Sequence, residues 1–191
     1  MAAAGESNAG PMRRAVFLDR DGVLNRVTYR AGKAESPLSL EELQLMPGVK
    51  AGLRLLRGAG FLLIGVTNQP DVVRGNVRRE VVEAINNRLA AELGLDEILT
   101  CWHDDNDQCA CRKPKPGLLL AAVRTHRIAL AESYIVGDRW RDIEAGQAAG
   151  CRTVWLRAPY AEREPLRPAD FVTGRFEDAA RWILRESETP A

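Results

Sequence analysis

The chain has 191 residues, of which 46% are apolar and 28% are charged, and its formal net charge is +1. This length and composition are typical of one soluble globular domain with a substantial core. A nearly neutral chain gives no electrostatic reason to expect a nucleic acid or an anionic membrane as partner.

In chain order, apolar runs alternate with stretches of helical periodicity. The pattern predicts six strands, at 15–19, 61–67, 97–102, 133–138, 153–156 and 170–172. It predicts five helices between and after them, at 47–60, 76–94, 117–127, 141–150 and 177–186. Pro47 is placed at the start of the first helix, and Asn76 is a candidate N-cap of the second.

The ends of the chain and its location can also be predicted. Residues 1–12 are small and polar, without the apolar core of a signal peptide, and indicate a flexible tail before a single domain at 13–191. No apolar run reaches the roughly 18 to 20 residues that a membrane helix needs. We therefore expect a cytoplasmic monomer, in which clustered cysteines indicate a metal before a disulfide.

The alternation of strands and helices predicts the fold class. Continuous apolar strands between helices are typical of a three-layer, Rossmann-like α/β fold, in which a parallel sheet has helices on both faces. Ligands of such sheets bind beyond the carboxyl ends of the strands. The connections leave no room for a large cap domain, so we expect short loops alone to cover the site.

Acidic residues stand where two predicted strands end. Asp19 and Asp21 belong to "DRDG" after the first strand, and Asp138 ends "IVGD". Carboxylates brought together at buried strand ends repel one another unless a cation lies between them, and Mg²⁺ prefers such oxygen ligands. The alternative for "DRDG" is an ordinary Asp-Gly turn.

Neutral and cationic residues complete this pattern. Thr67 and Asn68 end the second strand in "VTNQ", and Arg112 and Lys113 supply fixed positive charge. Acids, a hydroxyl and a cation at successive strand ends are the layout of a phosphoryl-transfer site, in which one carboxylate attacks phosphorus. A helix cap is the alternative interpretation of "VTNQ".

A second metal site is predicted at 101–111. Cys101, His103, Cys109 and Cys111 supply three thiolates and one imidazole, a tetrahedral ligand set for Zn²⁺. Because the protein fills all four positions, this zinc would be structural, holding the following cations in place. The alternative is three ordinary thiols and an incidental histidine. Cys151 lies outside the group and is predicted to be a core residue.

Four ordered motifs resemble those of the haloacid dehalogenase-like (HAD-like) phosphatases: "FLDRDGVLN", "VTNQ", "CRKPKPG" and "VGDRWRDIEAG". The resemblance extends from about residue 15 to 156. More narrowly, it is to the branch that contains D-glycero-D-manno-heptose 1,7-bisphosphate 7-phosphatase and the histidinol-phosphatase domain. That branch carries a zinc loop with the same ligand types.

The resemblance implies roles for the acids. Asp19 would be the nucleophile that becomes an aspartyl phosphate, and Asp21 the acid that protonates the leaving oxygen and then activates water. Mg²⁺ would be held by Asp19, by the backbone carbonyl of Asp21 or its neighbour, and by Asp138. Asp142 would act only indirectly, through metal-bound water.

It implies roles for other polar residues as well. Thr67 and Lys113 would stabilise the transferring phosphoryl group, and Asn68, Gln69 and Arg112 would lie near the substrate. The partner would be a small phosphorylated metabolite, most simply the heptose bisphosphate losing its 7-phosphate. Histidinol phosphate or another small sugar phosphate is the alternative substrate.

The resemblance is weaker at 25–37. This segment lacks the sugar-contacting motif of the heptose enzymes and adds Arg26, Arg30 and Lys33. Arg30 and Lys33 either bind a second phosphate or are simply solvated. Two other classes stay open: a binding module that uses the zinc loop as its surface, and a phosphotransferase or mutase of the same fold.

Overall fold

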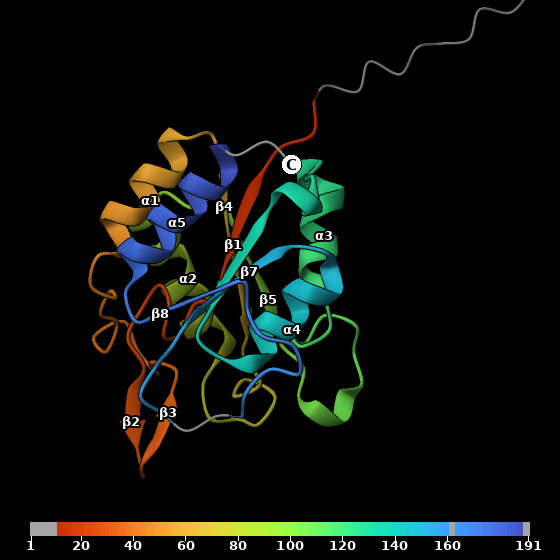
Figure 1. Cartoon of the computed structure of the whole chain (residues 1–191). Helices are drawn as coiled ribbons and strands as arrows, with labels where there is room; N and C mark the ends of the chain where they lie inside the picture. The colour runs from red at the N-terminus through yellow and green to blue at the C-terminus, as the bar shows by residue number, and fades with distance from the viewer. Residues whose placement is uncertain (1–10, 161–162, 189–191) are drawn as a thin grey trace, which may run out of the picture.

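Six strands form one parallel sheet in the computed structural model, which describes residues 11–160 and 163–188 (Figure 1). The strands are β1 (Ala15–Leu18), β4 (Leu62–Asn68), β5 (Glu97–Cys101), β6 (Tyr134–Gly137), β7 (Arg152–Leu156) and β8 (Phe171–Thr173). Their spatial order is β5-β4-β1-β6-β7-β8, and each neighbouring pair runs parallel. The six predicted strands are thus present, within one or two residues at their ends. Of the predicted tail, residues 1–10 lie outside the described residues.

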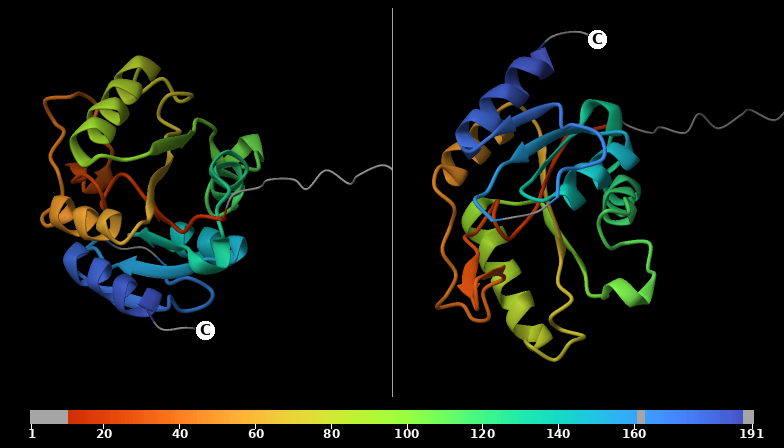
Figure 2. Two further views of the ribbon diagram at one scale, coloured as in Figure 1. Left: turned by 90° about the horizontal axis from the view of Figure 1, so that it is seen from above. Right: turned by 60° about the horizontal axis from the view of Figure 1, so that its bottom comes forward.

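Helices cover both faces of this sheet, which gives the three layers that the sequence predicts (Figure 2). The helices are α1 (Val49–Gly58), α2 (Arg79–Leu93), α3 (Gly117–His126), α4 (Trp140–Ala149) and α5 (Phe176–Glu188). In β1, Val16 and Leu18 pack into the core beneath α1, α2 and α5, whereas Ala15 and Phe17 face the core beneath α3. Because successive side chains of a strand alternate between faces, a wholly apolar strand is buried on both.

A small antiparallel hairpin follows β1, and the sequence did not reveal it. It pairs β2 (Thr28–Arg30) with β3 (Lys33–Glu35), and its turn residues Ala31 and Gly32 have φ values of 47° and 74°. Positive φ at both turn residues fits the twist of a two-residue hairpin. The sequence does not predict these two strands, because their residues are largely charged and show neither a continuous apolar run nor a clear alternation of apolar and polar residues.

The predicted cap of α2 is wrong. Arg78, not Asn76, is the N-cap residue, and it makes no capping bond through its side chain. The side chain of Asn76 instead donates a hydrogen bond of 3.0 Å to Asp71 in the loop after β4. Asn76 therefore stabilises the loop before the helix, because its amide finds a carboxylate partner there.

The carboxyl ends of the parallel strands meet at one edge of the sheet, at the bottom of Figure 1. The β2–β3 hairpin, the loop after β4 and the segment after β5 surround this edge (Figure 2, right). A short 3₁₀ helix, Asp105–Asp107, lies within the last of these, and another, Leu130–Glu132, precedes β6. Among the described helices none has the length and apolar character needed to cross a bilayer.

Candidate active site

Three buried carboxylates converge at the carboxyl edge of the sheet. Asp19 follows β1, Asp138 follows the adjacent strand β6, and Asp142 lies in the first turn of α4. One oxygen from each lies within 4.8 Å of the others, and the three residues, which we call the acidic cluster, are at most 7% exposed. The turn into α4 brings the Asp142 carboxylate into this group, and its expected role through metal-bound water stays a prediction.

Lys113 supplies the positive charge within this group. Its ammonium lies 2.7 Å from Asp19 Oδ1 and 2.5 Å from Asp142 Oδ1, and it donates to the backbone carbonyl of Val66 at 2.8 Å. The side chain is only 3% exposed. A single buried cation therefore holds two carboxylates together, and the acidic cluster keeps an excess of negative charge.

Burial and the excess of negative charge shift the pKa values of the groups in the acidic cluster. Burial, together with the nearby Asp142 carboxylate, raises the pKa of Asp19 to about 6. Burial and the charges of Asp19 and Asp142 raise the pKa of Asp138 well above its usual range. Burial opposes the charge of Lys113, but Asp142 and Asp19 outweigh it and raise the pKa of the ammonium.

The acidic cluster fits a hard divalent cation. Asp138 Oδ1 is buried, and among the described residues it has no hydrogen-bond partner. Such an atom is costly to bury unless a ligand satisfies it. Three carboxylates that lack sufficient counter-charge are suitable ligands for Mg²⁺, which prefers oxygen atoms and keeps some of its water.

Asp21 points elsewhere. Its carboxylate accepts hydrogen bonds from Arg20 at 3.0–3.2 Å, from Asn25 at 2.9 Å, and from Ser36 and Gln69 at 2.8 Å each. Burial opposes ionisation, but the Arg20 guanidinium and these donors hold the pKa of Asp21 below its usual range. The carboxylate thus lies outside the acidic cluster, and a metal bond from the backbone carbonyl of Asp21 stays a prediction.

The three polar residues after Val66 form a supporting network. Thr67 is fully buried and accepts a bond of 2.9 Å from Gln69, which also reaches Asp21. The Asn68 side chain makes two bonds of 3.1 Å to the backbone of Lys113, one as donor and one as acceptor. Thr67 and Asn68 line the cavity at this edge, but Gln69, expected near the substrate, is 1% exposed and is not part of the lining.

A polar cavity of about 860 Å³ opens over these residues. Its wall includes Asp19, Asp21, Lys113, Arg112, Arg74, Arg139, Arg141, Asp142, Tyr160, and Lys33 to Ser36 of the hairpin and the residue after it. Of the three extra cations after β1, Lys33 lines this cavity. Arg30 instead bonds to Glu42 and to Glu35, so its charge is already paired.

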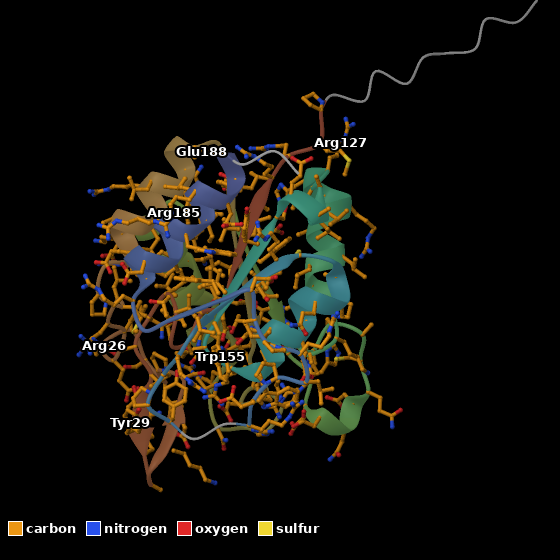
Figure 3. The ribbon with its side chains drawn as sticks, viewed as in Figure 1. Arg26, Tyr29, Arg127, Trp155, Arg185 and Glu188 are labelled. Carbon is orange, nitrogen blue, oxygen red and sulfur yellow. The ribbon has the colours of Figure 1, made fainter. Side chains whose placement is uncertain are left out.

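Arg26 is not among the residues of the cavity wall. In Figure 3 it lies at the outer margin of the molecule, whereas Trp155 lies near the middle of the view. Of the cations added at 25–37, Lys33 is therefore the one positioned to meet a ligand.

The backbone of Asp138 is also held in place, because the indole of Trp155 donates a bond of 3.0 Å to its carbonyl.

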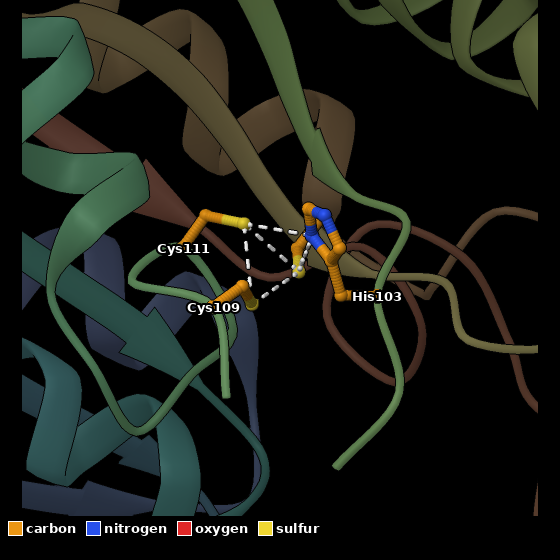
Figure 4. A group of neighbouring side chains, drawn as sticks. His103, Cys109 and Cys111 are labelled. Atoms are coloured by element: carbon orange, nitrogen blue, oxygen red, sulfur yellow. Dashed lines mark hydrogen bonds between the residues drawn. The ribbon is translucent and has the colours of Figure 1, made fainter. Parts of the chain in front are cut away.

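The four predicted zinc ligands come together (Figure 4). Cys101 is the last residue of β5, and the distances from its Sγ to the sulfurs of Cys109 and Cys111 are 3.7 and 3.2 Å. His103 Nδ1 lies 3.6 Å from Cys101 Sγ and 3.3 Å from Cys111 Sγ. These distances approach the edge, roughly 3.8 Å, of a tetrahedron with Zn–S bonds of about 2.3 Å. The donor set and its shape fit Zn²⁺.

The zinc-ligand segment is tied to the cations that follow it. Arg112 donates to the backbone carbonyl of His103 at 3.2 Å and to Asp105 at 2.8 Å. Lys113 is bonded through its backbone to Asn68 of β4. The zinc-ligand segment therefore orients Arg112, whereas the bonds of Lys113 run to the sheet edge, and its positioning by zinc stays a prediction.

Cys151 is a core residue, as predicted. It is 7% exposed and packs with the apolar side chains beneath α3. Burial raises the pKa of its thiol to about 12. It takes no part in the zinc-ligand group.

This chain is similar to several known proteins. The HAD-hydrolase-like family model matches residues 110–179. A D-glycero-beta-D-manno-heptose-1,7-bisphosphate 7-phosphatase of Pseudomonas putida is 35% identical over 176 residues, covering 90% of this chain and 97% of that protein. The protein of the same name from Rhodopseudomonas palustris is 35% identical over 154 residues, covering 74% and 82%.

A solved structure shows the same likeness. The D,D-heptose 1,7-bisphosphate phosphatase from B. bronchiseptica, complexed with magnesium and phosphate, has a TM-score of 0.72 and 27% identity. The match covers 91% of this chain and 99% of that one. The chain belongs to the HAD-like phosphatases. Within this family, its similarity is to the heptose-bisphosphate phosphatases just named, over most of its length.

Some residues of the site carry no clear signal in the sequence. Tyr160 comes from the connection after β7, and its hydroxyl donates to Asp138. Ser36 comes from the end of the hairpin and reaches Asp21. Both lie in irregular segments without a recognisable motif, so only the tertiary structure brings them to the acids.

Proposed function

We propose that this chain is a Mg²⁺-dependent phosphomonoesterase that forms an aspartyl phosphate on Asp19 and removes the 7-phosphate of D-glycero-D-manno-heptose 1,7-bisphosphate. The observation that carries the proposal is the position of Asp19. It stands at the end of β1, at the floor of the polar cavity, held by Lys113 and next to Asp138 and Asp142.

Asp19 is suited to nucleophilic attack. The Lys113 ammonium and the backbone N–H of Arg20 both donate to its Oδ1, at 2.7 and 2.8 Å, which fixes the carboxylate. A carboxylate oxygen then forms a bond to phosphorus while the ester oxygen leaves. Mg²⁺, held by the acidic cluster, would neutralise charge on the phosphoryl oxygens.

Lys113 and Thr67 stabilise the phosphoryl group as it transfers. Lys113 is the only cation that contacts Asp19 within the described chain, and both residues line the cavity. Because phosphoryl transfer relies on fixed positive charge and hydrogen-bond donors around the equatorial oxygens, a buried ammonium in this place is effective. Its rigid position reduces the reorganisation that the reaction requires.

Asp21 is the proposed acid and base. Its four donors favour the ionised carboxylate, which is the form that removes a proton from water during hydrolysis of the aspartyl phosphate. Protonating the leaving oxygen first requires Asp21 to carry a proton. The carboxylate must then give up part of its interaction with Arg20.

The cavity also supports the assignment of a sugar bisphosphate. Its volume of about 860 Å³ is within the range of small-molecule sites, and its wall is polar. Arg112 and Lys33 stand on opposite segments of the wall, the loop before α3 and the hairpin. Lys33 in particular suits a substrate with a second anionic group, as in the compounds named for the relatives, because Arg112 already pairs with Asp105.

The experiment measures phosphate release by the wild type, Asp19→Asn and a matched control, Asp71→Asn. Asp71 also lines the cavity but lies outside the acidic cluster. We expect Asp19→Asn to lose at least about a thousandfold in turnover with its fold intact, and Asp71→Asn to keep turnover within about fivefold. Retention of more than about a tenth of wild-type turnover by Asp19→Asn would refute the nucleophile.

A substrate panel tests the second half of the proposal. The heptose 1,7-bisphosphate should give a higher kcat/KM than histidinol phosphate and other small sugar monophosphates. Phosphate release that needs no acceptor separates a hydrolase from a phosphotransferase. Equal kcat/KM for all compounds would contradict the heptose assignment while leaving the phosphatase chemistry in place.

A further inference from the structure

Tyr160 reaches the acidic cluster from outside the four motifs. Its hydroxyl donates a hydrogen bond to Oδ2 of Asp138, and the residue lines the cavity. The second oxygen of the same carboxylate, Oδ1, is buried and has no hydrogen-bond partner among the described residues. One oxygen of Asp138 is therefore held by a phenol, and the other is left for a ligand.

The ring of Tyr160 is held in place on two sides. The guanidinium of Arg139 lies 5.4 Å from the ring centroid, and the ring of Tyr29 packs edge-on with a centroid distance of 6.5 Å. Tyr29 belongs to β2 and lies on the hairpin in Figure 3. Two separate segments, β2 and the turn between β6 and α4, thus hold the Tyr160 ring beside Asp138.

The first motif leaves room for this contact. Gly22 has a φ of +91°, and a β-carbon at this position would overlap both Asp138 Oδ2 and the Tyr160 hydroxyl. The turn after Asp21 therefore requires glycine, for its backbone conformation and for the space. The Tyr160–Asp138 bond is consequently packed against the catalytic turn.

We infer that Tyr160 is a positioning residue for the cation: by holding Oδ2 of Asp138, it presents Oδ1 to the metal and increases Mg²⁺ affinity. This inference rests on the cation site of the proposed function. Hydrogen bonds to the distal atoms of ligating carboxylates commonly change metal affinity by about 10- to 100-fold. A neutral phenol donates this bond without adding a charge that would repel the cation.

The experiment titrates Mn²⁺ into the zinc-loaded protein and follows free Mn²⁺ by electron paramagnetic resonance, without substrate. Four proteins are compared: wild type, Tyr160→Phe, Tyr29→Phe and Asp138→Asn. Tyr29→Phe is the matched control, because it removes a phenol hydroxyl but keeps the ring that packs on Tyr160. We expect Tyr160→Phe to raise the Kd about tenfold or more, Tyr29→Phe to change it less than twofold, and Asp138→Asn to abolish binding.

Steady-state kinetics supply a second readout. Tyr160→Phe should need about tenfold more Mg²⁺ for half-maximal turnover but reach nearly wild-type kcat when Mg²⁺ is saturating. An unchanged Mn²⁺ Kd would refute the positioning role, and a lower Kd would show that the phenol competes with the metal. Failure of the wild type itself to bind Mn²⁺, or wild-type binding by Asp138→Asn, would instead contradict the cation site.

Discussion

At the scale of single residues, the carboxylates of the acidic cluster outnumber the one buried ammonium that contacts them. Lys113 contacts Asp19 and Asp142, so one ammonium compensates two carboxylates, and the pKa of Asp138 is raised by burial and by the other two acids. Asp21, two residues from Asp19, has the opposite environment, with the buried guanidinium of Arg20 against it. Each acid must act against its environment in the metal-free site: Asp19 must be ionised to attack phosphorus, which a bound Mg²⁺ would favour, and Asp21 must take up a proton beside Arg20 before it can donate one.

The acid role of Asp21 predicts a dependence on the leaving group. An alkoxide must be protonated as it departs, whereas an activated aryl oxide is already a weak base. Asp21→Ala should therefore lower turnover of a sugar phosphate by at least about a hundredfold more than turnover of p-nitrophenyl phosphate. Steady-state kinetics with both esters measure the ratio, and equal losses would remove the acid role.

At the scale of elements, a segment without a core of its own leads into the two cations Arg112 and Lys113. Residues 102–112 include one short 3₁₀ helix, Asp105–Asp107, and the segment is tied to the sheet by Cys101 at the end of β5. So short a polar segment cannot offset its ordering entropy by apolar burial, whereas metal binding can. Zinc at the four ligands would thus fix the direction of Arg112 and the approach of the chain to Lys113, whose ammonium is held at the sheet edge.

Cys109→Ser tests this coupling. The wild type should contain about one zinc per chain, and the variant less, as measured by elemental analysis. Its KM should rise while the sheet, followed by circular dichroism, stays folded. Excess Zn²⁺ should not replace Mg²⁺ in turnover, because thiolate and carboxylate sites select different metals.

Cys151→Ala is the matched control. This thiol is buried under α3, away from the ligand group, so its loss should lower stability but leave the zinc content unchanged. A wild-type protein that holds no zinc after purification without chelators, yet is fully active, would contradict the structural role of the segment.

At the scale of the whole molecule, the acidic cluster couples cation binding to stability. Asp19 has an ordinary pKa of 3.8 that rises to about 6 in the folded, metal-free protein, and the pKa of Asp138 is raised as well. The folded state then binds more protons than the unfolded state between these values, so metal-free stability falls as pH rises through this window. A cation that binds only the ionised carboxylates stabilises the folded state at the higher pH, and so offsets the stability that the metal-free protein loses as pH rises.

Thermal unfolding with and without saturating Mg²⁺ measures this effect. The increase in Tm caused by Mg²⁺ should be larger at about pH 7.5 than at about pH 5, because protons compete for the same carboxylates at the lower pH. Asp138→Asn should show little increase at either pH. An equal Tm increase at both pH values in the wild type would contradict the raised pKa values.

Much of the fold could be predicted because its signals are local. Apolar strands such as Leu62–Asn68 and Tyr134–Gly137 are continuous in the sequence, and burial on both faces leaves few other arrangements for them. The β2–β3 hairpin could not be predicted, because its charged residues are stabilised by a tight turn and by contacts at the rim. The cap of α2 was mistaken because Asn76 has a nearby carboxylate partner, Asp71.

The chemical groups available at this site can be read from the order of residues alone: acids after two predicted strands, a cation after another, and four zinc-type ligands within 101–111. Which of these groups come into contact depends on how the chain folds. The tertiary structure places Asp142 with Asp19 and Asp138, turns Asp21 toward Arg20, and brings the Tyr160 hydroxyl to Asp138. The contacts of Asp142 and Tyr160 join residues from separate strands, a helix end and a loop, and their geometry depends on packing that spacing along the chain does not encode.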